Sequence, residues 1–472
     1  MNYYTIFMQL FVNTNKNKIF KEVEMQVKQK EERTAVVSKV MSLLDPGSFM
    51  ETGEHVAVRQ TEFYKPESVV ESDGVVTGYG TIKGNLVFVF AQDAEVMGGT
   101  FGAQHGRKII ELYERAIKAH APVIGLLDCA GFRIEEGMDG LHQFSKLYKV
   151  QTKAWKKIPQ IMAVIGQCGG GMSIAAELSD FVFIEEGKGS IFVNSQGVVS
   201  NAIGNNPYIS GVHDGSYDWE TIVDRITRLI DVLPPSADFT PEIQDVDEEV
   251  LNRSCPEIKG MQGDARAILT ELSDSYYLIE SQPDVGKDMV TGMIRIAGQA
   301  VGVIACNTVD GEKRITSEGC DKAAAIIEIC DKFNLPILTI TDTEGYQTTS
   351  ENEKNLPSAA ARMLIALTTA DVPKINLITG SIVGSAYSLL NPKGLGADYV
   401  FMWDSADASI VNARQATEVI FGKWSDELEQ QYRETQSSAI ALARHGLVDK
   451  VIAPEDTRKY LIGALQTFIN SR

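Results

Sequence analysis

VTGYGTIKGNLVFVF (residues 76–90) and VTGMIRIAGQAVGVI (residues 290–304) are the stretches that decide the fold of this chain. Seven of their 15 aligned positions are identical, whereas two unrelated segments of average composition would share roughly one. The offset of 214 positions (290 − 76) continues without a gap and aligns further pairs: Lys108 with Lys322, Pro122 with Pro336, Asp128 with Asp342, Gly131 with Gly345 and Gly170 with Gly384. This unbroken register predicts two domains with one fold.

Each repeat is predicted to alternate strands with helices. The first quoted stretch favours a hairpin that turns at Lys83-Gly84-Asn85. A helix is expected over 104–120 and another over about 138–157, because their apolar residues recur at helical spacing. The short apolar runs VIGLLD (123–128) and IMAVIG (161–166) are typical of buried parallel strands. The alternation predicts the α/β class with a mainly parallel sheet and right-handed crossovers.

A chain of 472 residues is longer than a single domain with one hydrophobic core usually is, which agrees with two domains. We expect residues 1–40 to be a poorly ordered tail, with ordered sequence beginning near Met41. The first domain is then expected over 41–235 and the second over 276–472. Residues 236–275, which include the acidic run DFTPEIQDVDEEV, are interpreted as the linker.

Composition narrows the class of function. The formal charge is −19, from 44 basic and 63 acidic residues, and such a surface repels phosphate backbones, so nucleic acid is not an expected partner. None of the six cysteines forms a C-x-x-C pair, which disfavours a zinc ribbon and a thioredoxin-like site, and their low density disfavours a secreted disulfide scaffold. We therefore expect a cytoplasmic protein without a metal site.

The candidate chemistry lies in glycine-rich loops at matched strand exits. They are Ala130-Gly131-Phe132 and Gly169-Gly170-Gly171 in the first domain, with Glu344-Gly345-Tyr346 and Val383-Gly384-Ser385-Ala386 in the second. Glycine lets backbone N–H groups face a cavity, and the second loop of each domain leads into a helix whose N-terminus offers unpaired donors. Such loops are also ordinary packing in strand–helix turns, but their repetition in register favours a pair of oxyanion holes.

Other chemistries fit less well. The sequence has no P-loop, no G-x-G-x-x-G between strand and helix, no G-x-S-x-G and no H-E-x-x-H. His142 is expected on a helix face and Cys129 in the core. Glu135 and Glu136 are interpreted as first-turn acids of the helix that follows them, with Arg133 tying the loop down.

At the level of whole motifs, the chain resembles a known family. The segments are DGVVTGYGTIKGNLVFVFAQD (73–93), LLDCAGFRIEEG (126–137), PQIMAVIGQCGGG (159–171), QPDVGKDMVTGMIRIAGQAVGVIACN (282–307) and VPKINLITGSIVGSAY (372–387). They are similar to the carboxyltransferase subunits of biotin-dependent acyl-CoA carboxylases and decarboxylases, from about Leu43 to the end. The resemblance implies two tandem crotonase-like ββα-spiral domains related by internal duplication.

The resemblance also implies a site and a reaction. A carboxyl group would move between carboxybiotin and a short-chain acyl-CoA, with one hole holding the thioester enolate and the other the ureido oxygen. The N-domain hole falls at Ala130, Gly131 and Phe132, close to Gly170 and Gly171. The remaining carried-over positions are Gly384, Ser385 and Ala386 for the C-domain hole, Gly345 and Tyr346 beside it, Ser388 for acyl size, and Gly98, Gly99 and Gly102 near coenzyme A.

Partners follow from the same resemblance. Biotin would arrive on a separate biotin carboxyl carrier protein, because the chain has no M-K-M attachment motif. Biotin carboxylase or membrane decarboxylase subunits are the expected partner proteins, so a position beside a membrane complex stays open. The family works as a homodimer or homohexamer, with the N-domain of one subunit facing the C-domain of another.

Departures from the family pattern keep alternatives open. They are Phe132 in place of the usual alanine, GGGMS after Cys168, and IVNARQA at 410–416. The chain could instead be the alpha subunit of a sodium-pumping decarboxylase or a non-catalytic assembly subunit. An enoyl-CoA hydratase needs a pair of glutamates, whereas this chain has only Glu177 after the glycine-rich loop. A ClpP-like peptidase needs a serine nucleophile at the position that Gly170 occupies.

Overall fold

The computed structural model of the chain describes residues 34–64, 72–194, 213–310 and 312–469. Its first sheet is built from β1 (Met50–Thr52), β2 (Val75–Ile82), β3 (Asn85–Gln92), β4 (Val123–Cys129), β5 (Gln160–Gly169), β6 (Phe181–Glu185), β7 (Ser190–Phe192) and β8 (Ser216–Tyr217). The eight strands run in the order β1-β2-β3-β4-β5-β6-β8, with β7 beside β5. The pairs from β3 onward are parallel.

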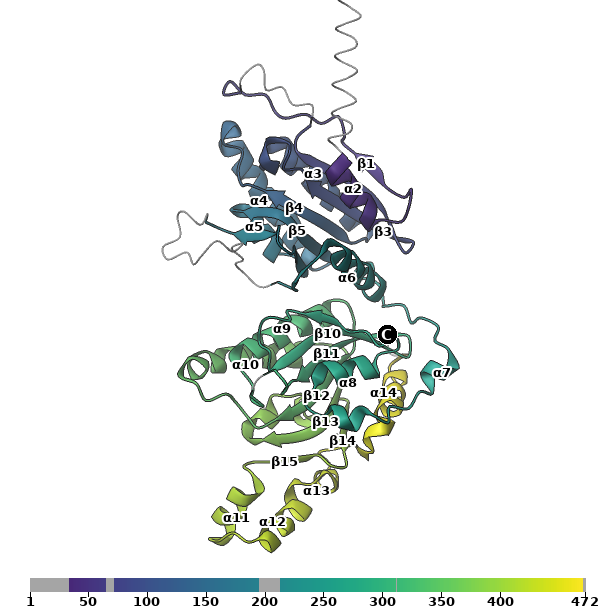
Figure 1. Ribbon diagram of the computed structural model, residues 1–472, viewed down its shortest axis with the longest axis vertical. Helices are drawn as coiled ribbons and strands as arrows, with labels where there is room; N and C mark the ends of the chain where they lie inside the picture. The colour runs from purple at the N-terminus through teal and green to yellow at the C-terminus, as the bar shows by residue number, and fades with distance from the viewer. Residues whose placement is uncertain (1–33, 65–71, 195–212, 311, 470–472) are drawn as a thin grey trace, which may run out of the picture.

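The second sheet repeats this order (Figure 1). Its strands are β9 (Ile279–Ser281), β10 (Met289–Ile296), β11 (Gln299–Cys306), β12 (Ile337–Thr343), β13 (Lys374–Val383), β14 (Tyr399–Trp403), β15 (Asp407–Ser409) and β16 (Lys450–Ile452). The order is β9-β10-β11-β12-β13-β14-β16, with β15 beside β13. The predicted α/β fold with two like domains is therefore present.

Helices follow the strands in both halves. Those of the first half are α2 (Thr34–Leu43), α3 (Ala103–Ala119), α4 (Met138–Trp155), α5 (Gly171–Glu177) and α6 (Trp219–Val232). The rest are α7 (Glu248–Leu251), α8 (Ala265–Leu272), α9 (Ser317–Lys332), α10 (Ser350–Thr369), α11 (Ala413–Phe421), α12 (Asp426–Tyr432), α13 (Ala439–Arg444) and α14 (Thr457–Gln466). Short helical turns are η2 (Met97–Gly99), η3 (Ile134–Glu136), η4 (Ile258–Met261), η5 (Gly384–Ser388), η6 (Lys393–Leu395), η7 (Arg433–Ser437) and η8 (Pro454–Asp456).

The duplication seen in the sequence has an equivalent in the coordinates. The bounds of β10, β11, β12 and β13 equal those of β2, β3, β4 and β5 shifted by 214 positions, as in 289 − 75 and 374 − 160. Isolated bridges at Phe101–Phe132 and Ile315–Tyr346 obey the same offset. Beyond Gly169 the offset changes, since β14 begins 218 positions after β6 (399 − 181). The matched region therefore ends just after the second glycine-rich loop begins.

Each domain opens with a tight hairpin. Lys83 and Gly84 both have positive φ between β2 and β3, as a two-residue type I′ turn requires. Asp45 accepts hydrogen bonds from both turn N–H groups, at 3.0 and 2.9 Å. In the second hairpin, Ala297 and Gly298 repeat the turn, and Asp274 clamps it at 2.9 and 2.8 Å.

Buried apolar side chains arrange the sheets in layers. One cluster packs α3, α4 and α5 against the first sheet, and a second packs α8, α13 and α14 against the second sheet. A third is continuous between the halves and includes α2, α6, α9 and α10. Helix α6 contacts both β6 and β9 and lies between the two sheets in Figure 1, so one shared core fixes the halves together.

Two expected segment boundaries shift in the structure. Residues 1–33 of the expected tail lie outside the described residues, but α2 begins at Thr34 rather than near Met41 and buries Val40 completely. In the expected linker, α8 buries Ile268, Leu269 and other residues in the core of the second sheet. The apolar periodicity of these segments is short, and their packing partners are distant in sequence.

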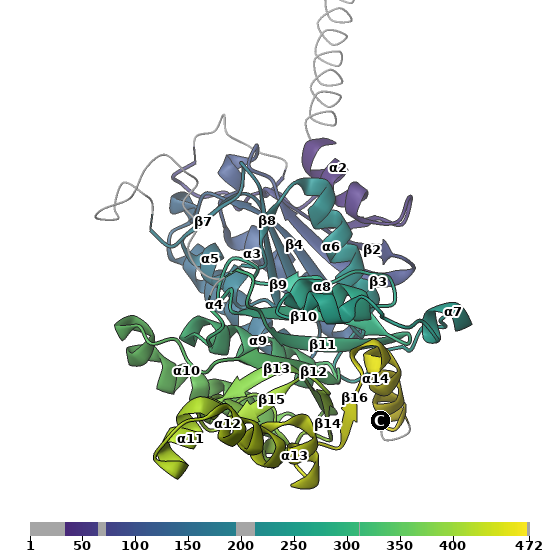
Figure 2. The same cartoon turned by 60° about the horizontal axis from the view of Figure 1, so that its bottom comes forward.

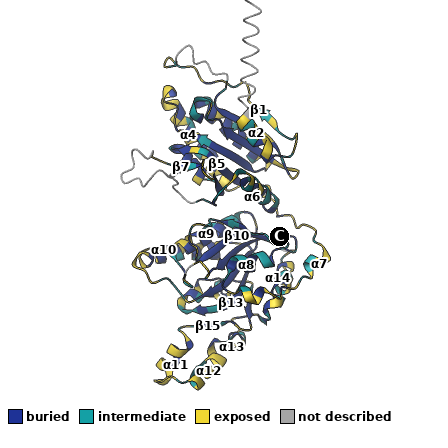
Figure 3. Ribbon diagram, in the orientation of Figure 1, coloured by how far each residue is buried: buried dark blue, intermediate teal, exposed yellow. Residues whose placement is uncertain are grey.

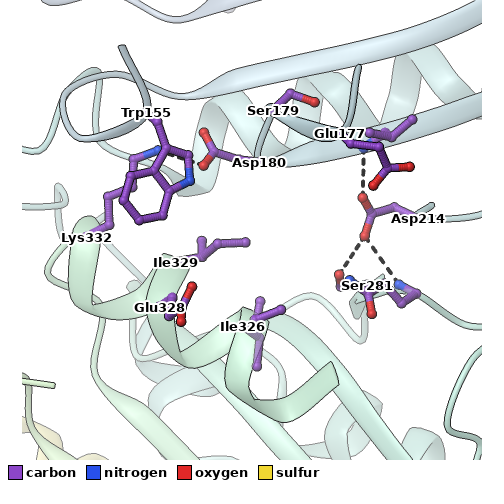
Figure 4. A pocket seen from close by; sticks show the side chains of 13 residues that line it. Trp155, Glu177, Ser179, Asp180, Asp214, Ser281, Ile326, Glu328, Ile329 and Lys332 are labelled. Carbon is purple, nitrogen blue, oxygen red and sulfur yellow. Dashed lines mark hydrogen bonds and ion pairs between the residues drawn. The ribbon is translucent and has the colours of Figure 1, made fainter. Parts of the chain in front are cut away.

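A polar seam closes the contact between the halves (Figure 4). Lys332 on α9 pairs with the buried Asp180 at 2.6 Å. Asp214 accepts from the Ser281 hydroxyl at 2.5 Å and from Val182 N at 2.8 Å. These groups line a pocket of about 240 Å³. None of the predicted site residues lines it, so the seam serves the packing of the domains.

Candidate functional site

Both domains fix their strand exits in the same way. Asp128 at the end of β4 accepts a hydrogen bond from Gln167 N at 3.0 Å, and Asp342 receives the equivalent bond at 2.9 Å. A Cβ at Gly166 or Gly380 would lie 2.2 or 2.1 Å from the carboxyl group. These contacts hold the first glycine-rich loop of each domain beside the second.

The first N-domain loop offers fewer free donors than the sequence indicated. Ala130 N donates to the carbonyl of Gly98 at 3.1 Å, so this N–H is already bonded. Gly131 has φ +124°, and a Cβ there would meet nothing within 4 Å. Within the described ranges, the Gly131 N–H has no acceptor. The Phe132 N–H likewise has no acceptor in these ranges, so the N–H groups of Gly131 and Phe132 are the available donors of this loop.

The second N-domain loop supplies another donor. Gly170 N donates to the carbonyl of Phe192 at 2.9 Å, whereas the N–H of Gly171 lies at the start of α5 and is not used in the described part of the chain. A side chain at 171 would displace Tyr148, since a Cβ would lie 2.8 Å from the Tyr148 hydroxyl. That hydroxyl donates to the Gly171 carbonyl at 2.8 Å, which orients the N-terminus of α5.

A buried charged network stands behind the first loop. Arg133 is fully buried, pairs with Asp73, and donates to Glu136 at 3.1 Å and to the Thr100 carbonyl at 2.7 Å. Glu136 accepts from Ala103 N at 2.6 Å. This corrects the sequence interpretation: Glu136 serves the N-terminus of α3, the preceding helix, while Arg133 does tie the loop down.

His105 extends this network to the strand exit. Its Nδ1 lies 3.0 Å from the Asp73 carbonyl, and its Nε2 lies 3.2 Å from the Gln92 amide nitrogen. The Gln92 amide oxygen accepts from Asp128 N, which sets the amide orientation. Burial lowers the pKa of His105 to about 3, so the ring is neutral. No sequence pattern predicts this network, because its members come from separate elements.

Three further glycines support the loop from behind. Gly98 lies 3.6 Å from the Ala130 side chain, measured from its Cβ position, and Gly99 approaches the Asp128 carbonyl so closely that no Cβ could fit. Gly102 faces Arg133 and Glu136. These are the positions that the resemblance placed near coenzyme A, and they lie against the hole loop itself.

The C-domain loops carry polar side chains at the matched places. Tyr346 takes the position of Phe132, and Ser385 that of Gly171. Burial raises the pKa of Tyr346, and its hydrogen bond with the Ser385 hydroxyl opposes that shift. Lys313 pairs with Asp342 at 2.6 Å and donates to the Ser381 hydroxyl at 2.9 Å. Ala386 is buried in η5.

The C-domain loop opens into a pocket of about 690 Å³. It brings together three predicted positions, Gly384, Ser385 and Ser388. Tyr387 and Ser409 add polar groups from η5 and β15, and Tyr432, Gln436 and His445 add others from the helical segments after β15. The last three were missed in the sequence, because they lie far from the loop along the chain and no local pattern connects them with it.

The described residues include neither a metal-binding cluster nor a membrane-spanning helix. In the ranges that the structure covers, no group of three His, Cys, Asp or Glu side chains could hold a metal ion. None of the helices described combines the length and apolar character needed to cross a bilayer. The donors that the hole loops present are backbone N–H and hydroxyl groups, which suit an oxyanion.

Comparisons with known proteins agree with this geometry. The model of the carboxyl transferase domain family matches residues 27–472. The propionyl-CoA carboxylase beta chain of Cereibacter sphaeroides is 31% identical over 95% of this chain and 93% of its own length. The methylmalonyl-CoA decarboxylase alpha subunit of Veillonella parvula is 30% identical over 92% of this chain and 90% of its own.

A solved structure is similar throughout. The transcarboxylase 12S hexamer, with methylmalonyl-CoA and methylmalonic acid bound, superimposes with a TM-score of 0.85 at 29% identity, covering 94% of this chain and 91% of the other. The predicted family resemblance and the tandem crotonase-like fold are confirmed.

Proposed function

The chain belongs to the carboxyl transferase domain family, and we propose that it moves a carboxyl group between carboxybiotin and a short-chain acyl-CoA, with the acyl group in the N-domain hole. That it is an enzyme of the carboxyltransferase type acting on acyl-CoA follows from its relatives. We further propose which of the two holes binds each reactant and which residues line it.

The single observation that carries this assignment is the contrast between matched side chains. The N-domain hole is flanked by the Phe132 ring, whereas the C-domain hole is flanked by the hydroxyl groups of Tyr346 and Ser385. An acyl chain is apolar and suits the first, while a ureido group has donors and acceptors and suits the second.

In the proposed mechanism, the N–H groups of Gly131 and Gly171 stabilise the oxygen of the thioester enolate as its charge develops. The backbone at Ser385, at the start of η5, faces the ureido oxygen, and the Ser385 hydroxyl orients it. Carboxybiotin supplies the activated carboxyl group and reaches the site on a separate carrier protein. Tyr346 contacts the biotin side of the pocket, and Ser388, which lines the same pocket, keeps the role in acyl size that the family resemblance implies.

A second copy of the chain completes the site. All residues that line the C-domain pocket lie between 384 and 447, so this pocket contains no residue of the N-domain. Large apolar side chains are exposed around each hole: Phe132, Ile134, Met138, Leu141 and Ile174 in the N-domain, and Ile410, Val419, Ile420, Phe421, Trp424 and Ile440 near α11 to α13. Figure 3 colours much of α11 and α12 as exposed, and Figure 2 shows α11, α12 and α13 side by side along one edge of the second domain. Such surfaces mark interfaces, which supports a homodimer or, as in transcarboxylase 12S, a hexamer.

The second candidate runs the same chemistry in the opposite direction. The likeness to the Veillonella parvula alpha subunit favours release of the carboxyl group from methylmalonyl-CoA as part of a decarboxylase. Biotin carboxylase is the partner expected for the first candidate, and membrane decarboxylase subunits for the second. Copurification with either class of subunit distinguishes them.

The test is transfer of radiolabelled carboxyl from malonyl-CoA or methylmalonyl-CoA to free biotin. Gly131→Val and Ser385→Val should each lower turnover by about 10²- to 10³-fold, because each displaces a hole donor. Gly463→Ala is the matched control, since its Cβ would meet nothing within 4 Å and it lies inside α14. Unchanged turnover in both hole variants would refute the placement of the site, and a folded wild-type oligomer without turnover would refute the enzyme assignment.

A further inference from the structure

The residue beside the N-domain hole that the backbone chemistry leaves unexplained is Phe132. It follows the open Gly131, and 38% of its surface is exposed, which is high for a phenylalanine. Its ring edge, at Cε2, lies 3.9 Å from the Cβ position of Gly170. The ring therefore spans from the first loop to the second, beside the N–H groups of Gly131 and Gly171.

The Phe132 ring is supported from behind by other aromatic rings. It meets Phe144 edge-on with centroids 4.8 Å apart, and Phe144 stacks on the buried Phe101 at 3.8 Å. Tyr148 lies 5.8 Å from Phe144 and bonds the Gly171 carbonyl through its hydroxyl. Because these rings pack against the core beneath α3 and α4, the Phe132 side chain cannot move far when a ligand binds.

We propose that Phe132 is the specificity-determining residue of the acyl site, limiting the substrate to acetyl-CoA and propionyl-CoA and excluding butyryl-CoA and longer chains. This inference rests on the proposed function and deepens it. An enolate oxygen between Gly131 and Gly171 places the α-carbon next to the ring, so each added methylene has to displace an aromatic side chain that has no space behind it. The C-domain counterpart, Tyr346, belongs to the other hole and should not affect acyl length.

The size of the effect can be bounded. One methylene more than a pocket accepts typically costs 10- to 200-fold in kcat/KM. Wild-type protein should therefore use malonyl-CoA and methylmalonyl-CoA as carboxyl donors to free biotin, and use ethylmalonyl-CoA at least about tenfold less well.

The experiment compares these three donors in the full-length oligomer. Phe132→Ala should raise the ratio of kcat/KM for ethylmalonyl-CoA over malonyl-CoA by about tenfold or more, and Phe132→Leu should raise it by less. Tyr346→Phe should leave the ratio within about twofold, whatever it does to the rate. If Phe132→Ala does not fold, the leucine variant decides, because it keeps an apolar side chain at the half-exposed position.

The possible results distinguish a failure of this inference from a failure of the proposed function. Wild-type protein that transfers carboxyl from none of the donors overturns the proposed function. Transfer that continues in both Phe132 variants with an unchanged ratio overturns the role of Phe132 alone. A shift of the ratio in Tyr346→Phe as large as in Phe132→Ala would overturn the assignment of the acyl group to the N-domain.

Discussion

The two strand exits share a backbone and differ in the side chains placed on it. At matched positions the N-domain has His105, Phe132 and Arg133, whereas the C-domain has Gly319, Tyr346 and Gln347. The bridge from Phe101 to Phe132 is repeated between Ile315 and Tyr346, so the loop path is the same. Duplication thus provides two sets of backbone donors, and substitution at single positions gives one set an apolar neighbour and the other a polar one.

The largest difference expected between the halves is in stability. Arg133→Met should lower the free energy of unfolding by about 3–5 kcal/mol, because it leaves the buried carboxylates of Asp73 and Glu136 without their cation. Gln347→Met, at the matched and partly exposed C-domain position, should cost within about 0.5 kcal/mol. Urea unfolding measures both values.

Hydrogen exchange shows where the Arg133→Met effect lies. Exchange should accelerate in peptides covering residues 123–137 and remain unchanged in those covering 337–351. Equal losses in the two variants would mean that the network behind the N-domain loop is not the feature that distinguishes the domains.

The shared fold of the two domains could be predicted from the sequence, since repetition and periodicity can be read directly along the chain. The hairpin turn at Lys83-Gly84 and the helix predicted over 104–120, observed as Ala103–Ala119, are examples. The pairing of Arg133 with Asp73 was not accessible, because it joins residues 60 positions apart. The lining of the C-domain pocket could not be predicted for the same reason, because His445 and Ser385 both line it and are far apart in sequence.

A smaller difference concerns pH. In the neutral His105 ring, Nδ1 donates to the Asp73 carbonyl and Nε2 accepts from the Gln92 amide nitrogen. A proton on Nε2 would therefore face the N–H group of Gln92, which is also a donor, and the hydrogen bond between them would be lost. The folded-state pKa of about 3 lies below the ordinary 6.5, so the stabilisation from His105 is present above pH 6.5 and is lost as pH falls toward 3. At pH 5 the loss should be about 2 kcal/mol.

The measurement compares wild type with His105→Gln at pH 7.5 and pH 5. Burial raises the pKa of Asp73 to about 6, so Asp73 takes up a proton in the same range and acts with the opposite sign. Because Asp73 is present in both proteins, the difference between their unfolding free energies isolates the histidine. That difference should fall by about 2 kcal/mol at the lower pH, and a constant difference would contradict a buried neutral ring.

The smallest effect should come from making the C-domain resemble the N-domain at one atom. Tyr346→Phe removes the hydroxyl that bonds Ser385 and leaves the ring in place. A hydrogen bond of this kind contributes about 0.5–1.5 kcal/mol, so kcat/KM for free biotin should fall by roughly three- to tenfold. The KM for malonyl-CoA should not change if the acyl group occupies the N-domain hole, as proposed. A loss expressed in the malonyl-CoA dependence instead would exchange the roles of the two holes, and with them the reason why one is lined by Phe132 and the other by Tyr346.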